Sequence, residues 1–172
     1  METLPGIPQP NLLLAAATAL IPLVVGFVWY NPKVFGKTWM AGAGVTEEDG
    51  KKMNMPLVFG LTYVLSFFIS IFLHFWTIHQ FAFSSLLMPA RNFTDAAGFQ
   101  EAIAKAALLS QHKFRSWSHG LAHGVIFSVM FILPVIAIDG MFGRKTWKYI
   151  LINWGYWMVC VVLMSIIICR FA

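Results

Sequence analysis

Residues 147–169 read WKYILINWGYWMVCVVLMSIIIC, a run with a single charged side chain, Lys148. A helix needs about 20 mainly apolar residues to cross the hydrocarbon core of a bilayer, and this run is long enough. Three more runs meet the same criterion, at residues 11–30, 56–79 and 117–138. We therefore expect an all-α membrane protein with four transmembrane helices, in which residues 1–172 form one integral membrane domain.

The composition of the chain agrees with a membrane domain. Hydrophobic residues make up 59% of it and charged residues only 11%, with a mean hydropathy of +0.72, whereas soluble domains carry about 25% charged residues. The net charge of +5 is divided among the connections between the apolar runs, where it meets lipid headgroups. Since no tract is rich in both Arg and aromatic residues, we expect no nucleic-acid partner.

The basic residues also predict the orientation of the four helices. With four crossings, the connections at 31–55 and 139–146 share one side and, with Lys148, hold seven Lys or Arg, against five on the other side. By the positive-inside rule, both termini are predicted to be non-cytoplasmic. Indole side chains near the ends of the runs are predicted to anchor the helices at the membrane interface; these are Trp29, Trp39, Trp117 and Trp147.

Residues 94–110, between the second and third runs, predict an amphipathic helix and not a fifth crossing. Thr94 is a suitable N-cap and Asp95 lies in the first turn, and Glu101 and Lys105 are spaced to pair. An apolar stripe follows the helical period at Phe99, Ala102, Ile103, Ala106 and Leu109. Such a helix is either a packed surface connection or a lid over a site beneath it.

The two connections on the cytoplasmic side contain similar sequence motifs, VFGKTW at 34–39 and MFGRKTW at 141–147. Each follows a run that contains one proline, Pro22 or Pro134, which predicts a kink that a membrane helix tolerates. The similarity indicates two helical hairpins that arose by an internal repeat. Alternatively, glycine, a base and tryptophan were selected twice as an interfacial anchor.

Three stretches together resemble a known family. FVWYNPKVFGKTWM (27–40), VTEEDGKKMNM (45–55) and FGRKTWKYILINWGYWMV (142–159) are similar to domain-of-unknown-function family 1761, and the resemblance covers nearly the whole chain. It implies a small bacterial integral membrane protein with four spans, located in the inner membrane. It implies no activity and no catalytic residue.

Histidine is the residue type that offers chemistry here, and the topology places all five at the non-cytoplasmic face. His119 and His123 share a helix face at i, i+4. Together with His74 or His79 they form a candidate site for Zn, Cu or haem iron, and Gly120 and Gly124 would let another helix or a flat ligand approach. A proton-responsive cluster, or histidines that merely pack at the interface, are the alternatives; the fifth is His112.

A second polar set, Asn31, Asp139 and Asn153, is predicted near the cytoplasmic end. We expect Asp139 to pair with Arg144 or Lys145, and not to act as a transport carboxylate. No nucleophile elbow or Ser-His-Asp set is recognisable, so the sequence does not predict an enzyme.

Three classes of function are compatible with these features. The first is a non-catalytic membrane component, either a self-associating bundle or an accessory subunit of a membrane complex, with the bilayer, further copies or other membrane subunits as partners and no cofactor. The second is a small transporter or channel. The third is a metal- or haem-binding protein that uses the histidines of the outer face.

Overall fold

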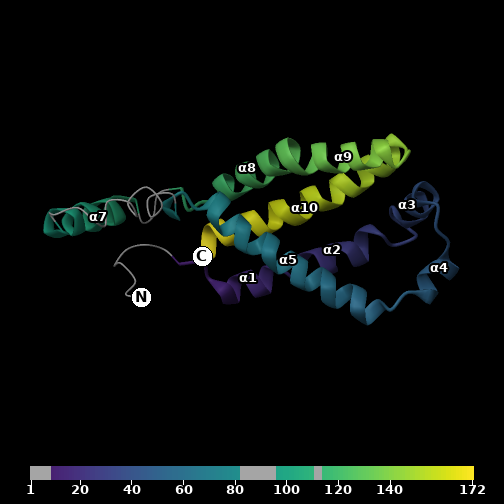
Figure 1. The fold of residues 1–172 in the computed structure, drawn as a ribbon, viewed down its shortest axis with the longest axis horizontal. Coiled ribbons are helices and arrows are strands. Elements are labelled where there is room, and N and C mark those ends of the chain that lie inside the picture. The colour runs from purple at the N-terminus through teal and green to yellow at the C-terminus, as the bar shows by residue number, and fades with distance from the viewer. Residues whose placement is uncertain (1–8, 82–95, 111–113) are drawn as a thin grey trace.

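The structure is a computed structural model that describes residues 9–81, 96–110 and 114–172. Within these ranges it confirms the all-α fold and four helices long and apolar enough to cross a membrane: Leu12–Trp29, Met55–Thr77, Trp117–Phe142 and Trp147–Phe171. Figure 1 shows that the first helix begins, and the last ends, at the same end of the bundle. The third helix also begins at that end, which we call the histidine end; the opposite end is the loop end.

The last crossing, α10 (Trp147–Phe171), is the central helix of the bundle. It packs against all three other crossings and carries most of the buried apolar side chains. The main apolar cluster joins it to α5 (Met55–Thr77) and to the turn that follows α5; the members are Leu73, Ile78, Phe81, Val161, Met164 and Ile168.

The first crossing consists of two helices, α1 (Leu12–Thr18) and α2 (Ile21–Trp29). The interruption comes immediately before Pro22, which has no N–H with which to continue the helical ladder. Pro22 is buried, and its carbonyl accepts a hydrogen bond of 2.8 Å from the hydroxyl of Tyr156 on α10. The break is therefore fixed by a contact between helices.

The third crossing contains a π-helical turn. It runs through α8 (Trp117–Phe127), η2 (Ser128–Ile132) and α9 (Leu133–Phe142). Pro134 lies in the first turn of α9 and cannot donate a backbone hydrogen bond, and wider turns are one way in which membrane helices accommodate such a residue. The carbonyl of Ser128 accepts from the indole N–H of Trp154 at 3.1 Å, which ties this turn to α10.

Two short helices lie at the loop end between the first and second crossings (Figure 1), α3 (Gly36–Ala43) and α4 (Glu47–Lys52). The sequence GKTW at 36–39 therefore begins α3. By contrast, FGRKTW at 142–147 forms the turn between α9 and the start of α10. The two similar stretches therefore adopt different local structures.

The amphipathic segment forms α7 (Ala96–Ser110). In Figure 1 it extends beyond the histidine end and lies neither across the bundle as a lid nor against it as a packed connection. Glu101 and Lys105 approach to 3.5 Å as expected, but both are exposed, so the pair contributes little to stability. The predicted cap Thr94, Asp95 and also His112 lie outside the described residues.

Candidate metal centre

The structure brings three of the candidate histidines together at the histidine end. His119 and His123 lie in the first two turns of α8, and His79 follows the end of α5. One nitrogen from each side chain lies within 4.8 Å of the other two. The ring centroids are 4.4 Å apart for His119 and His123, and 4.9 and 5.0 Å from each of these to His79.

Two of these imidazoles present nitrogens that are free to bind. Nε2 of His119 and Nδ1 of His123 are buried and have no hydrogen-bond partner among the described residues, although each whole side chain is only half-buried, and His79 is exposed. With Zn–N bonds of about 2.05 Å, ligand nitrogens in a tetrahedral site lie about 3.3 Å apart. Side-chain movements of about 1 Å would bring the three nitrogens to that spacing.

Local contacts hold the two histidines of α8 in place. The hydroxyl of Ser116 caps the helix and accepts from the backbone N–H of His119 at 3.2 Å. The indole N–H of Trp76 on α5 donates to the backbone carbonyl of His123 at 3.2 Å, with the two rings 5.7 Å apart. Trp76 therefore links the end of the second crossing to the start of the third. In the sequence its only signal is its place near the end of the second apolar run, which marks an interface but not a site.

Gly120 and Gly124 set the distance between α8 and α10. A Cβ on Gly120 would lie 2.7 Å from the Cα of Ile166, and one on Gly124 would lie 2.6 Å from the Cα of Val162. Both distances are too short for any side chain, so these glycines allow α10 of the same chain to approach. This face is consequently closed to a flat ligand and to a second copy of the chain.

His74 does not belong to the group of three. It is fully buried, and its Nδ1 lies 2.8 Å from the carbonyl oxygen of Ser70 one turn earlier on α5. Its Nε2 has no hydrogen-bond partner within the described ranges. Because α5 continues to Thr77, His74 lies within the helix and its side chain is buried in the core. His79 lies after the extended residue Ile78, outside the helix, and is directed towards α8.

The segments that carry these histidines, residues 72–81 and 114–124, contain no acidic side chain and one basic side chain, Arg115. Arg115 precedes α8 and donates to the carbonyl oxygen of Ala172; burial lowers the pKa of its guanidinium. The ring of Phe114 packs against His79 and His119, with centroids 5.6 and 5.2 Å away. An aromatic ring thus borders the three histidines, whereas the guanidinium of Arg115 is engaged with Ala172.

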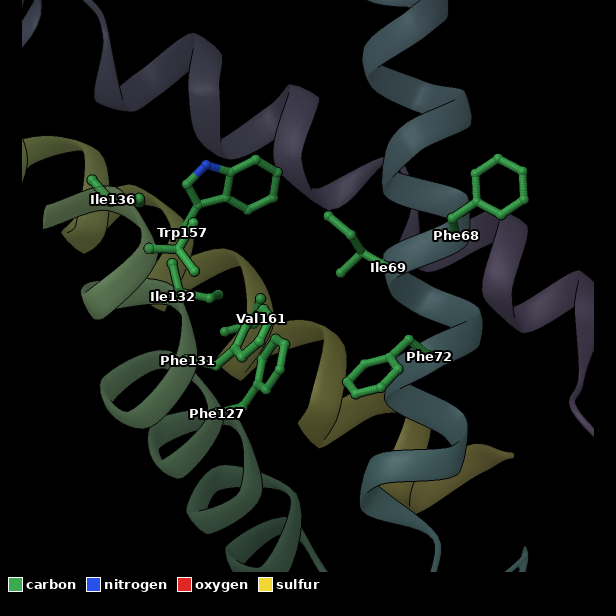
Figure 2. A pocket seen from close by; sticks show the side chains of 10 residues that line it. Phe68, Ile69, Phe72, Phe127, Phe131, Ile132, Ile136, Trp157 and Val161 are labelled. Atoms are coloured by element: carbon green, nitrogen blue, oxygen red, sulfur yellow. The ribbon is translucent and has the colours of Figure 1, made fainter. Parts of the chain in front are cut away.

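A membrane-facing cavity of about 480 Å³ lies deeper in the bundle, between α5, the third crossing and α10. Figure 2 shows Ile69 and Phe72 of α5 pointing towards side chains of the other two crossings. Every residue that lines it is apolar or aromatic; we call it the aromatic groove, and its residues are Phe68, Ile69, Phe72, Phe127, Phe131, Ile132, Val135, Ile136, Trp157 and Val161.

The polar residues predicted at the cytoplasmic side are separated by the structure. Asn153 is central: its side-chain oxygen accepts from the hydroxyl of Tyr30 and from the indole of Trp39, both at 3.1 Å. Its amide donates to the carbonyl of Tyr149 at 2.8 Å.

Asn31 and Asp139 take no part in this network. The side chain of Asn31 accepts from the backbone N–H of Lys33 and shapes the turn after α2. In the part of the chain that the structure describes, Asp139 is exposed and forms no ion pair, so the predicted pairing is wrong. Lys145 instead donates to the carbonyl of Ala43 at 2.7 Å.

The predicted tryptophan anchors divide into two groups. Trp117 and Trp147 are exposed at helix ends, 53% and 59% respectively, as interfacial residues are. Trp29 and Trp39 are half-buried and donate to α10, the former to the carbonyl of Ile152 at 3.1 Å and the latter to Asn153. These two therefore contribute to packing between helices.

Four apolar crossings, with short helices at the loop end and histidines gathered at the other, define a multi-pass α-helical membrane protein. The chain belongs to the family described as protein of unknown function DUF1761, whose match covers residues 13–169, and this confirms the resemblance seen in the sequence. No curated protein and no solved structure matches the chain.

Proposed function

We propose that this protein binds a divalent transition metal, Zn²⁺ or Cu²⁺, through His79, His119 and His123. The observation that carries the proposal is the convergence within 4.8 Å of three ligand nitrogens, two from the start of the third crossing and one from the turn after the second. Neutral imidazole is a preferred ligand of both ions. His119 and His123 each also have a ring nitrogen that is buried without a partner among the described residues, and a metal bound by these nitrogens would satisfy them.

The geometry supports a metal ion better than haem. A bis-histidine haem needs its two imidazoles on opposite sides of a macrocycle, but His119 and His123 lie one turn apart on one helix. Of the two occupants expected at the glycine face beside them, another helix or a flat ligand, the structure shows a helix, α10. Three histidines also leave a fourth coordination position open in a tetrahedral site.

The bound metal would join the end of the second crossing to the start of the third, and so would connect the two halves of the bundle. The excess of Lys and Arg at the loop end supports a non-cytoplasmic location for the site. In the inner membrane of a bacterium, it would face the periplasmic side. We therefore favour a metal-binding membrane component, without catalysis of its own, over a transporter.

The test is metal analysis of detergent-purified protein carrying an affinity tag without histidine. After removal of bound metal with a chelator and titration with ZnCl₂, we expect one Zn²⁺ per chain. His79→Ala, His119→Ala and His123→Ala should each reduce the affinity at least about tenfold, equivalent to about 1.4 kcal/mol. His74→Ala is the matched control and should retain full binding, because its imidazole lies outside the group.

Titration with Co²⁺ gives an independent readout of the ligand geometry. A tetrahedral site with nitrogen ligands should produce intense visible absorption that is lost in His119→Ala. Stoichiometric binding that survives in all three cluster variants would contradict the assignment, as would the absence of binding in the wild type.

A further inference from the structure

The aromatic groove lies within the apolar depth of the bundle, so only hydrocarbon has access to it. Its residues come from the interior of three crossings, and none offers a polar side chain apart from the indole of Trp157. Val161 at its floor is fully buried, whereas Phe68 and Phe131 at its edge are 61% and 59% exposed. The groove is therefore a recess in the lipid-facing surface that fits a hydrocarbon chain.

A continuous wall of rings connects this groove to the three histidines. Phe131 stacks on Phe127 with centroids 5.2 Å apart, and Phe127 lies 5.4 Å from Phe72 and 5.8 Å from Trp76. The ring of Trp76 in turn lies 5.7 Å from that of His123. A molecule that lies along this wall has one end in the groove and the other end at the histidines.

The depth of the groove below the histidines matches the length of an acyl chain whose headgroup lies at the histidines. At 1.5 Å per residue, Phe127 lies about 6 Å and Ile136 about 20 Å below His123 along the helix. One leaflet of the hydrocarbon core is about 15 Å thick. A lipid whose headgroup lies at the level of the histidines therefore places its acyl chain at the level of the groove.

Charge at the histidine end selects the type of headgroup. A divalent ion held by three neutral imidazoles is a net positive centre with an open position. The guanidinium of Arg115 is engaged with Ala172, and α8 begins two residues before His119, so that the positive end of the helix dipole lies beside the histidines. With no acidic side chain in residues 72–81 or 114–124, the surroundings favour an anionic oxygen ligand.

We propose that the protein binds an anionic phospholipid, with its acyl chain in the aromatic groove and a phosphate oxygen at the fourth position of the metal. The headgroup contact rests on the proposed metal site, whereas the acyl-chain contact does not. The π-helical turn supports the site structurally because it contributes Phe131 and Ile132 to the groove.

The experiment uses phosphatidic acid and phosphatidylcholine that each carry a mid-chain brominated acyl chain, which quenches the fluorescence of nearby tryptophan, here Trp157 and Trp76. Both lipids are titrated into protein in detergent, once loaded with Zn²⁺ and once after chelation. Zn²⁺-loaded wild type should bind phosphatidic acid at least about tenfold more tightly than phosphatidylcholine, equivalent to about 1.4 kcal/mol. Chelation, or His119→Ala in the presence of Zn²⁺, should abolish this preference.

The groove is tested with a matched pair of variants on α5. Ile69→Phe adds a ring inside the groove and should weaken the binding of both lipids at least about fivefold, roughly 1 kcal/mol. Leu65→Phe places the same ring one turn away, at a 62% exposed position outside the groove, and should leave lipid affinity unchanged. Zn²⁺ content is measured on the same samples, so that loss of metal and loss of lipid are recorded separately.

Four results would each overturn a different part of the inference. An equal affinity for the two lipids in protein shown to hold Zn²⁺ would exclude the headgroup contact and leave the metal site standing. Equal effects of the two phenylalanine variants on lipid affinity would exclude the groove as the binding site of the acyl chain. Cross-linking between copies through groove residues would show that a second chain occupies the groove. If the wild type binds no Zn²⁺, the proposed metal site and the headgroup contact both fail, whereas the Ile69 and Leu65 pair still tests the groove.

Discussion

The two ends of the bundle differ in whether their buried polar side chains have hydrogen-bond partners. At the loop end, Asn153 uses both its oxygen and its amide in three hydrogen bonds to Tyr30, Trp39 and Tyr149. At the histidine end, His119 and His123 each have a buried nitrogen for which the described residues provide no partner. The first arrangement is complete within the chain, and the second needs another molecule or water.

This difference indicates that the polar residues of the loop end stabilise the fold, whereas those of the histidine end serve to bind a ligand. Buried polar groups that satisfy one another stabilise a fold, whereas an unsatisfied buried group costs about 1–3 kcal/mol. Such a cost is commonly retained where the group has a ligand. We therefore expect substitutions at the loop end to reduce the stability of the protein, and substitutions at the histidine end to reduce its ability to bind a ligand.

The largest effect is expected for Asn153→Leu. It removes three hydrogen bonds and leaves the donors of Tyr30 and Trp39 without an acceptor, at a total cost of about 3 kcal/mol in the free energy of unfolding. His119→Leu removes a buried nitrogen that has no partner among the described residues, so it should leave the stability of the metal-free protein unchanged or increase it. SDS-induced unfolding in mixed micelles measures the free energy of unfolding of both variants. Equal losses of stability in the two variants would contradict the proposed difference between the two ends.

The next effect is stabilisation by metal. A ligand that binds only the folded state at 100 times its dissociation constant stabilises that state by about 2.7 kcal/mol. We expect added Zn²⁺ to raise the unfolding free energy of wild type by this amount. The increase should be retained in His74→Ala and absent from His123→Ala. A Zn²⁺ response that persists in His123→Ala would place the metal elsewhere in the chain.

Gly124→Ala tests the contact that positions the histidines. The added methyl group would lie 2.6 Å from the Cα of Val162, so α8 and α10 must separate, at a cost of about 2 kcal/mol. Gly60→Ala on α5 is the control, because its Cβ would meet nothing within 4 Å and alanine favours a helix. Thermal unfolding followed by circular dichroism compares the two, and Gly124→Ala should also weaken Zn²⁺ binding.

The crossings could be predicted from the sequence because the hydrophobic runs are long and the bilayer fixes their length. The predicted run 147–169 and the helix Trp147–Phe171 differ only at one end. The break at Ala19 and Leu20 and the π-helical turn at Ser128–Ile132 could not be located in the same way. Proline indicates a distortion nearby, but the form it takes depends on contacts such as that between Tyr156 and Pro22.

The candidate site was predicted in part. The spacing of His119 and His123 places them on one face of any helix, and this needs no tertiary information. The choice between His74 and His79 as the third member depended on where α5 ends. That end, at Thr77, is not marked in the sequence by a glycine or proline, and the turn at Ile78 is held by packing in the apolar cluster. The ring wall from Trp76 to Phe131 likewise exists only after the crossings have packed.

The smallest effect is expected at α4, where the loop end also satisfies its own polar groups. The side chain of Asp49 accepts hydrogen bonds from the hydroxyl and the backbone N–H of Thr46, at 2.7 and 2.9 Å, and these lower the pKa of Asp49. Because the folded pKa is the lower one, the stabilisation is fully present above the ordinary value of about 3.9 and is lost as the pH falls through the folded pKa. The protection of the α4 amides, measured relative to the intrinsic exchange rate at each pH, should therefore fall upon acidification below about pH 4, whereas Asp49→Asn should show little change in protection over that range. The amides at the start of α8 should show no corresponding change over this pH range, because no carboxylate lies in residues 72–81 or 114–124. If their protection fell in the same acid transition, the two ends of the bundle would be coupled.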